Sequence, residues 1–169
     1  MTDLLFAAGA LNHVNFLEIV RHPWFMSAFV AGGSAQLLKF VVASLRARQP
    51  RWHELLSSGG LPSGHAALVS ALAFAIGFTE GFAAPYAMIA VGLGLIVLVD
   101  AVTLRREAGE HARTLNRIVR HLNGVNEADR LEIDKLEERL GHSVREMLAG
   151  VAFGALIAFV VCLIWDFWK

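Results

Sequence analysis

Four apolar stretches of about twenty residues each constrain the fold of this chain more than any other feature. They cover about residues 24–45, 64–82, 86–104 and 147–165. An α-helix rises about 1.5 Å per residue, so a stretch of this length crosses the roughly 30 Å hydrocarbon core of a bilayer. The mean hydropathy is +0.52 and only 18% of the residues are charged, which is too apolar for an ordinary soluble domain. We therefore predict an all-α fold in which residues 1–169 form a single integral membrane bundle of about four transmembrane helices.

The N-terminal segment, residues 1–22, is apolar but interrupted by several polar side chains. This pattern is typical of a short helix that lies in the membrane interface, and His22-Pro23 would end that helix. The segment lacks the basic region and small-residue cleavage site of a signal peptide. We therefore expect an interfacial helix here.

The one long polar segment, residues 105–146, separates the third and fourth apolar stretches. Apolar residues recur in it at helical spacing as far as Asn123-Gly124, where we expect a break. A second helix, capped by Asn126, would then run to Gly141. The apolar residues of the two helices are Leu115, Ile118, Val119, Leu122, Leu131, Leu136 and Leu140. We predict a helical hairpin outside the membrane, with a packing stripe beneath a solvated face.

Composition excludes several classes of function. The 15 basic and 15 acidic residues cancel, so charge gives no reason to expect nucleic acid as a partner. Cys162 is the single cysteine, which rules out an intrachain disulfide or a cysteine-based metal site. No carboxylate cluster or His/Cys set has the spacing of metal ligands. We expect neither a metal nor any other cofactor.

The stretch Ser57-Ser58-Gly59-Gly60-Leu61-Pro62-Ser63-Gly64-His65 opens the second apolar stretch and is the first candidate for chemistry. Backbone N–H groups at a helix start lack internal partners and carry partial positive charge, and glycine lets an anion approach them. His65 adds a group that gains or loses a proton near neutral pH. The alternative is a capped helix start, which proline, serine and glycine commonly mark.

Charged side chains inside the apolar stretches are the second candidate. Lys39 lies at a depth where a charge is costly, and Arg46 follows two helical turns later on the same face. The pair suits a shared anionic target, although Lys39 could instead extend its amine to the interface. Asp100 lies near the end of the third stretch, close to Arg105 and Arg106. We interpret Asp100 as a structural acid in an ion pair rather than as a catalytic group.

Alternating spans would bring these groups to one end of the bundle. The residues concerned are Lys39, Arg46, Ser63, Gly64, His65, Arg105, Arg106, His142 and Glu146. Cations, two histidines and a carboxylate at one mouth suit phosphoryl transfer: the cations offset phosphoryl charge, one histidine attacks, and the other protonates the leaving alcohol. Glu146 follows His142 by one helical turn and could hold one ring nitrogen, leaving the other free as nucleophile.

This pattern resembles the three-part signature of the phosphatidic acid phosphatase type 2 and vanadium haloperoxidase superfamily. It is most similar to the divergent bacterial and plastid membrane branch, over nearly the whole chain after Trp24. The matching residues are Lys39 and Arg46, the run Gly59-Gly60-Leu61-Pro62-Ser63-Gly64-His65, Asp100 with Arg105-Arg106, Gly141-His142-Ser143, and Glu146.

The resemblance implies a role for each matching residue. His142 would be the nucleophile and His65 the acid that protonates the leaving group. Phosphate would be held by Lys39, Arg46, Ser63, a backbone N–H of Gly64, and Arg105 or Arg106. The implied protein is a metal-independent phosphatase of the inner membrane of a bacterium.

Three functions remain open at this point. The first is hydrolysis of a phosphorylated lipid or polyprenyl phosphate through a phosphohistidine intermediate. The second is binding or transport of such a lipid at the same anion site without hydrolysis. The third is an interaction role in which the 105–146 hairpin docks a partner. Each has the lipid bilayer as its environment, and a homo-oligomer is compatible with all three.

Basic residues predict the orientation of the chain. Twelve of the 15 lysines and arginines lie in the connector 46–63 and in the segment 105–146, which would share one face. Cytoplasmic loops carry the excess of lysine and arginine. We therefore predict that the site faces the cytoplasm and that both termini lie outside, whereas the resemblance implies an outward-facing site.

Overall fold

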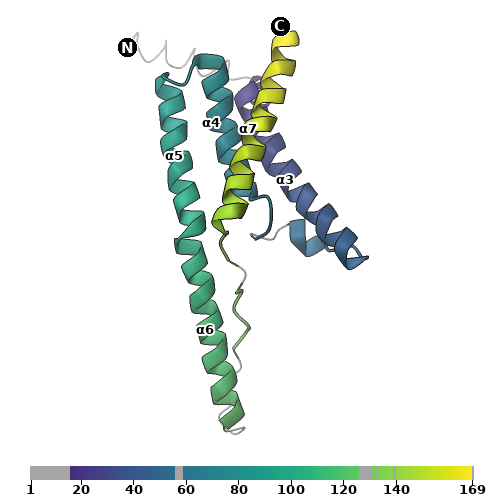
Figure 1. Cartoon of the computed structure of the whole chain (residues 1–169), viewed down its shortest axis with the longest axis vertical. Helices are drawn as coiled ribbons and strands as arrows, with labels where there is room; N and C mark the ends of the chain where they lie inside the picture. The colour runs from purple at the N-terminus through teal and green to yellow at the C-terminus, as the bar shows by residue number, and fades with distance from the viewer. Residues whose placement is uncertain (1–15, 56–58, 126–130, 132, 139, 169) are drawn as a thin grey trace, which may run out of the picture.

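The computed structural model describes residues 16–55, 59–125, 131, 133–138 and 140–168. All regular structure among these residues is helical, as the all-α prediction required. Figure 1 shows the elements in chain order: α2 (Phe16–Arg21), α3 (Pro23–Ala47), the short 3-10 helix η1 (Trp52–Leu55), α4 (Gly64–Glu80), α5 (Pro85–Val102), α6 (Leu104–Val125) and α7 (Val144–Phe167).

The apolar stretches become α3, α4, α5 and α7. By length and composition α3, α7 and the continuous helix Pro85–Gly124, whose apolar part is α5, can each cross a membrane, while α4 is apolar but has only 17 residues. At about 1.5 Å per residue, 17 residues span about 25 Å, slightly less than the hydrocarbon core. The structure therefore confirms three long apolar candidate spans and a shorter apolar helix in place of a fourth full-length span.

Helix α4 lies at the centre of the bundle and packs against α3, α5 and α7. Small side chains allow this close packing, because the buried cluster around α4 consists mainly of alanines from three helices. Its members are Ala31, Ala35, Ala67, Ala71, Ala75, Ala158 and Cys162. At the end of the bundle near the termini, the Trp24 indole Nε1–H donates a 2.7 Å hydrogen bond to the Thr79 hydroxyl, joining α3 to α4.

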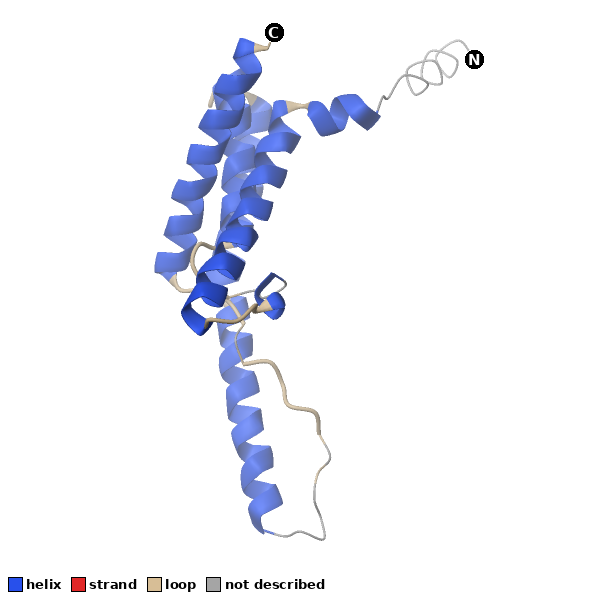
Figure 2. Ribbon diagram, turned by 90° about the vertical axis from the view of Figure 1, so that its right-hand side faces the viewer, coloured by secondary structure: helices blue, strands red, loops and turns tan. Residues whose placement is uncertain are grey.

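Helix α2 precedes α3 at this same end (Figure 2), within the segment expected to be interfacial. His22 separates the two helices, and its side chain accepts a hydrogen bond from the backbone N–H of Trp24 at 3.4 Å. Pro23 then occupies the first turn of α3, where its missing N–H costs nothing. The rest of the predicted interfacial helix, residues 1–15, lies outside the described residues.

The polar segment after α5 differs from the predicted helical hairpin. Helix α6 continues beyond α5 as a long arm and ends at Val125, close to the break predicted at Asn123-Gly124. The chain then returns toward α7, and its described residues 131, 133–138 and 140–143 are not helical, so the predicted second helix is wrong there. Asn126, the expected cap of that helix, lies outside the described residues.

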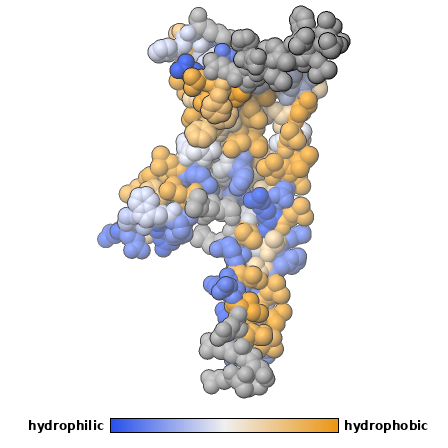
Figure 3. Space-filling model, turned by 180° about the vertical axis from the view of Figure 1, so that it is seen from behind, coloured by the Kyte–Doolittle hydropathy of each residue, from blue (hydrophilic) through white to orange (hydrophobic). Residues whose placement is uncertain are grey.

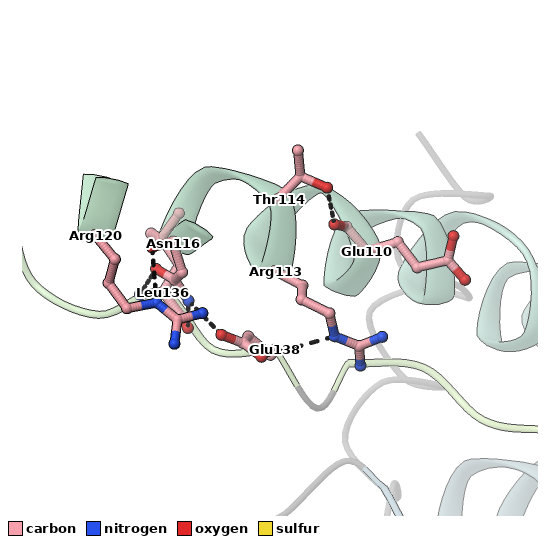
Figure 4. A network of polar contacts seen from close by, with 7 residues as sticks. All are labelled: Glu110, Arg113, Thr114, Asn116, Arg120, Leu136 and Glu138. Carbon is pink, nitrogen blue, oxygen red and sulfur yellow. Dashed lines mark hydrogen bonds and ion pairs between the residues drawn. The ribbon is translucent and has the colours of Figure 1, made fainter. Parts of the chain in front are cut away.

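Two asparagines of α6 explain the non-helical return. The Asn116 side chain donates to the Leu136 carbonyl at 2.9 Å and accepts from the Leu136 N–H at 3.0 Å. Asn123 makes the same pair of contacts with the backbone of Leu131, at 3.1 and 2.8 Å. Figure 4 shows the Asn116 contact beside the ion pair of Arg113 with Glu138. Because side chains of α6 satisfy these backbone groups, the return segment needs no helix of its own.

Candidate active site

The loop before α4 ends in a capped helix start. The Ser63 hydroxyl accepts a hydrogen bond from the Ala66 N–H at 3.3 Å, and Ser63 is completely buried. Its own backbone N–H donates to the Glu146 carbonyl at 3.1 Å, which ties this loop to the first turn of α7. The Ser63 side chain therefore caps α4, as the alternative interpretation of this stretch expected. The loop that carries it nevertheless lies next to Glu146, another of the candidate site residues.

His142 lies just before α7 and is almost fully buried. Its backbone N–H donates to the Ala101 carbonyl at 2.9 Å, which holds it against the end of α5. The neighbouring Gly141 has a positive φ of 79°, and a Cβ there would lie 2.5 Å from the backbone nitrogen of Arg106. Only glycine fits at this close approach without backbone strain.

Glu146 is fixed by a capping box at the start of α7. Its carboxylate accepts from the Ser143 N–H at 2.8 Å, and the Ser143 hydroxyl accepts from the Glu146 N–H at 3.3 Å. The same carboxylate oxygen lies 3.7 Å from Nδ1 of His142. Glu146 is therefore positioned to orient the His142 ring, at a distance slightly longer than a hydrogen bond.

The second histidine comes from the first turn of α4. The rings of His65 and His142 lie with their centroids 6.4 Å apart, and the His65 ring is the more exposed of the two. This pair is built from two segments separated by more than seventy residues of sequence. A small anion that contacts both rings would sit between them.

Lys39 reaches this region from α3 and is buried, so its side chain does not extend away to the interface. A Cβ on Gly60, whose φ is +98°, would lie 3.6 Å from Cδ of Lys39, so the loop before α4 passes directly over the lysine. The Lys39 charge acts on both His65 and His142, and the Glu146 carboxylate acts in turn on Lys39.

A cleft of about 360 Å³ opens beside Lys39, between α3 and the loop before α4. Arg46, predicted to share a face with Lys39, contributes to the same wall. The complete lining consists of Leu38, Lys39, Val42, Ala43, Arg46, Glu54, Gly60, Leu61 and Pro62. Its polar side carries two cations and the Glu54 carboxylate, its other side is hydrocarbon, and Lys39 links it to the histidines, which do not line it themselves. A groove of similar volume at the opposite end of the bundle, beside Arg21 and Trp165, is almost wholly apolar and far from both histidines.

The two consecutive arginines at the start of α6 have different surroundings. Arg105 forms an ion pair with Asp100, Nε to Oδ2 at 3.0 Å, and the charges of both act on His65. Arg106 instead pairs with Glu110 at 3.5 Å on the outer surface of α6. The structure therefore brings Arg105 toward the histidines and leaves Arg106 on the arm.

Two further side chains lie beside the candidate site, and neither belongs to the motifs identified in the sequence. Glu54, in η1, is buried beside Lys39 and contacts Nε2 of His53 at 3.3 Å. Gln36 lies against Gly64, and its Oε1 is buried without a hydrogen-bond partner among the described residues. Gln36 and Lys39 are three residues apart, which places them on the same face of α3, and this spacing could have identified Gln36 from the sequence. Glu54 lies in a polar connector, where no sequence pattern distinguishes it from its neighbours.

Burial controls the protonation of His142. The pKa of its imidazole is lowered, first by burial and then by the positive charge of Lys39, while the Glu146 carboxylate opposes the shift. A lowered pKa keeps the ring neutral at pH 7, with a free electron pair on one nitrogen.

The fold and site together define a helical membrane protein with a histidine pair and one buried lysine at one end of its bundle. Residues 20–157 match the model of the family described as "Divergent PAP2 family", and the chain belongs to this family. It is also similar to "Uncharacterized membrane protein YuiD" of Bacillus subtilis (strain 168), with 30% identity over 153 residues, covering 86% of this chain and 97% of that protein. No solved structure matches the chain.

Proposed function

We propose that the protein is a metal-independent phosphatase that acts on a lipid or polyprenyl phosphate. The observation that carries this proposal is the arrangement of His142: a buried imidazole with a fixed carboxylate near one nitrogen and a second histidine ring 6.4 Å away. A neutral, oriented imidazole beside cations has the properties of an activated nucleophile for a phosphoryl group.

In the proposed reaction, Nε2 of His142 attacks phosphorus, and the bond from phosphorus to the substrate alcohol breaks. His65, in its protonated form, gives its proton to the leaving alkoxide, so the alcohol departs neutral. Neutral His65 then accepts a proton from water, which attacks the phosphohistidine and releases inorganic phosphate. Glu146 accepts a hydrogen bond from Nδ1–H of His142 once the 3.7 Å between them shortens in the complex, and Lys39, Arg46 and Arg105 offset the charge on the phosphoryl oxygens.

The cleft beside Lys39 supports a lipid as the substrate. Its cationic wall suits a phosphate, and the apolar wall formed by Leu38, Val42 and Leu61 suits the adjoining hydrocarbon. Because the cleft borders α3, a candidate span, a lipid could present its headgroup there without leaving the bilayer. The ligand class we propose is therefore a phosphate ester carried on a membrane lipid.

A second candidate, binding or transport of the same lipid without hydrolysis, is favoured by one distance. Nδ1 of His142 is 3.7 Å from the Glu146 carboxylate, which is longer than a hydrogen bond. If the ring is not held more tightly when ligand is present, the site remains an anion receptor. The two candidates share their residues and differ only in turnover.

We propose that the protein lies in the plasma membrane of a bacterium with this site facing the cytoplasm. The support is the distribution of basic residues, of which 12 of 15 fall in the two segments at the site end of the bundle. Orientation depends on the loops of this chain, so the charge count outweighs the outward orientation implied by the superfamily resemblance.

Phosphate release from the purified protein separates the two candidates. We expect release from one or more of phosphatidate, phosphatidylglycerol phosphate and a polyprenyl phosphate, undiminished by EDTA and inhibited by vanadate, which mimics pentacoordinate phosphorus. The His142→Ala variant should lose both turnover and the phosphoenzyme. Loss of activity on chelation, restored by Mg²⁺, would contradict the mechanism. Lipid that co-purifies with His142→Ala, combined with no turnover in the wild type, would establish the receptor instead.

A further inference from the structure

Helix α6 stands apart from the bundle. It starts after Thr103 and runs on from α5 as an arm (Figure 1), and among the described helices it contacts only α5, where the two meet end to end. At about 1.5 Å per residue, its 22 residues extend about 33 Å. Such an arm has to cover its apolar side chains with something other than the bundle.

One side of the arm is covered by the chain itself. The positions concerned recur at spacings of three and four residues, and we call them the closed seam: Gly109, Ala112, Asn116, Val119 and Asn123. A Cβ on Gly109 would lie 2.9 Å from the Glu138 carbonyl, so the return segment lies directly on the helix. Ala112 and Asn116 are buried beneath it, and Figure 4 shows the Asn116 contact.

A second side of the arm has the same periodicity, and none of the described residues covers it. We call it the open seam, and it comprises Leu104, Ala108, His111, Leu115, Ile118 and Leu122, all exposed. The successive spacings are four, three, four, three and four residues. The side chains of Leu115, Ile118 and Leu122 are each about half exposed, at 49%, 50% and 50%. Figure 3 shows apolar side chains gathered along the arm below the bundle.

The spacing identifies the kind of partner. An apolar repeat of 3.5 residues on average is what a helix needs to pack along another helix with interlocking side chains. The arm continues the direction of α5 away from the bundle (Figures 1 and 2). Together the two form a helix of 40 residues, Pro85–Gly124, which is about 60 Å long at about 1.5 Å per residue, roughly twice the hydrocarbon core. With α5 in the bilayer, most of the open seam therefore lies outside it. The return segment is already engaged on the closed seam.

We propose that the open seam binds the open seam of a second copy of this chain, in a parallel two-stranded coiled coil outside the membrane. All copies have the same orientation in a membrane, so their arms point in the same direction and their seams are in register about a two-fold axis along the membrane normal. In heptad terms, Ala108, Leu115 and Leu122 occupy a positions, while Leu104, His111 and Ile118 occupy d positions. His111 is the one polar side chain of the six, and a single polar core position specifies register.

The closed seam limits the assembly to two strands. Leu at a with Ile at d can favour larger bundles, which bury the flanking e positions. Here those positions are Ala112 and Val119, and the return segment of the same chain lies over this side of the helix. One partner helix therefore fits along the open seam, but two or three do not.

Cysteine cross-linking in native membranes tests the proposal. In a Cys162→Ser background, Ile118→Cys should give a disulfide-linked dimer on mild oxidation, because identical d positions face each other across a parallel two-fold axis. The matched control is Arg120→Cys, two residues away on the opposite side of α6, and we expect at least tenfold less cross-linked dimer from it. Equal cross-linking of both variants, no cross-linking of either, or a product joined to a different protein would each overturn the proposal.

Mass measurement in lipid nanodiscs provides a second test. The wild type should contain two copies, and a Leu115→Ser, Ile118→Ser double variant should contain one while keeping its helical circular dichroism. Leu115 and Ile118 lie on the arm, away from the two histidines, and the mass is measured directly. The test therefore does not depend on whether the protein hydrolyses phosphate esters. A wild-type mass of one or three copies, or two copies in the folded double variant, would refute the two-stranded contact.

Discussion

Replacing Gly150 with alanine tests whether the close approach of α7 to α4 supports the candidate active site. Gly150 lies in α7 beside the loop that carries Ser63. A Cβ at position 150 would come 2.5 Å from the Ser63 carbonyl oxygen and 2.8 Å from the Ala66 side chain. The first of these contacts is with backbone, so rotation of a side chain cannot relieve it. The two helices have to separate, and the bond from the Ser63 N–H to the Glu146 carbonyl spans the same gap.

Two opposing contributions set the change in the free energy of unfolding of Gly150→Ala. Forcing an extra methyl group into a close-packed interface costs about 1–3 kcal/mol. Alanine in place of glycine within a helix contributes about 0.5–1 kcal/mol in the other direction. The net loss in the free energy of unfolding is about 1 kcal/mol, or roughly 2–4 °C in Tm for a chain of this size.

Gly33→Ala is the matched control, because a Cβ at position 33 meets nothing within 4 Å. It adds the same methyl group to α3 and should leave Tm unchanged or raise it slightly. Tryptophan fluorescence during heating in detergent measures both variants, and phosphate release measures the site. Gly150→Ala should lower both quantities. If Gly150→Ala is as stable and as active as Gly33→Ala, the tight α4–α7 contact does not hold the site.

Three further predictions concern the histidines and the orientation. His65→Ala should slow hydrolysis of a lipid phosphate far more than that of p-nitrophenyl phosphate, because an acidic leaving group needs no proton; equal losses would remove His65 from the acid role. Lys39→Met should lower kcat/KM and move its acid limb to higher pH, since removal of a positive charge raises the pKa of His142 and protonates the nucleophile sooner; an unmoved limb would contradict this. A cysteine at Asn126 in a Cys162→Ser background should resist an impermeant maleimide in intact cells, and ready labelling would reverse the orientation.

The sequence was sufficient to locate the apolar helices. Bilayer thickness sets their length, and the bounds of α3, α5 and α7 fall within about three residues of the predicted ones. The motifs also single out His65 and His142, whose rings lie 6.4 Å apart, centroid to centroid, in the structure. Both observations depend on local patterns, because the length of an apolar stretch and a short motif are properties of consecutive residues.

Tertiary structure placed the groups that no local pattern connects. The ion pairs of Arg105 with Asp100 and of Arg106 with Glu110 join residues five and four positions apart, so they follow from local spacing. Glu54 lies beside Lys39 because η1 folds back against α3. The His65 and His142 rings lie 6.4 Å apart, centroid to centroid, while the loop before α4 is hydrogen-bonded to the start of α7. These last placements depend on contacts between residues distant along the chain.

Helix α6 and the return segment show most clearly which features local sequence predicts and which depend on the folded chain. Apolar spacing correctly predicted a helix that ends near Asn123, but it also predicted a second helix that does not form among the described residues. The backbone N–H groups of Leu136 and Leu131 donate to the side chains of Asn116 and Asn123. These hydrogen bonds take the place of the ones that a helix in the return segment would make. The order of residues alone fixes which positions of α6 are apolar. Only the folded chain decided that the return segment covers one of its seams and leaves the other open.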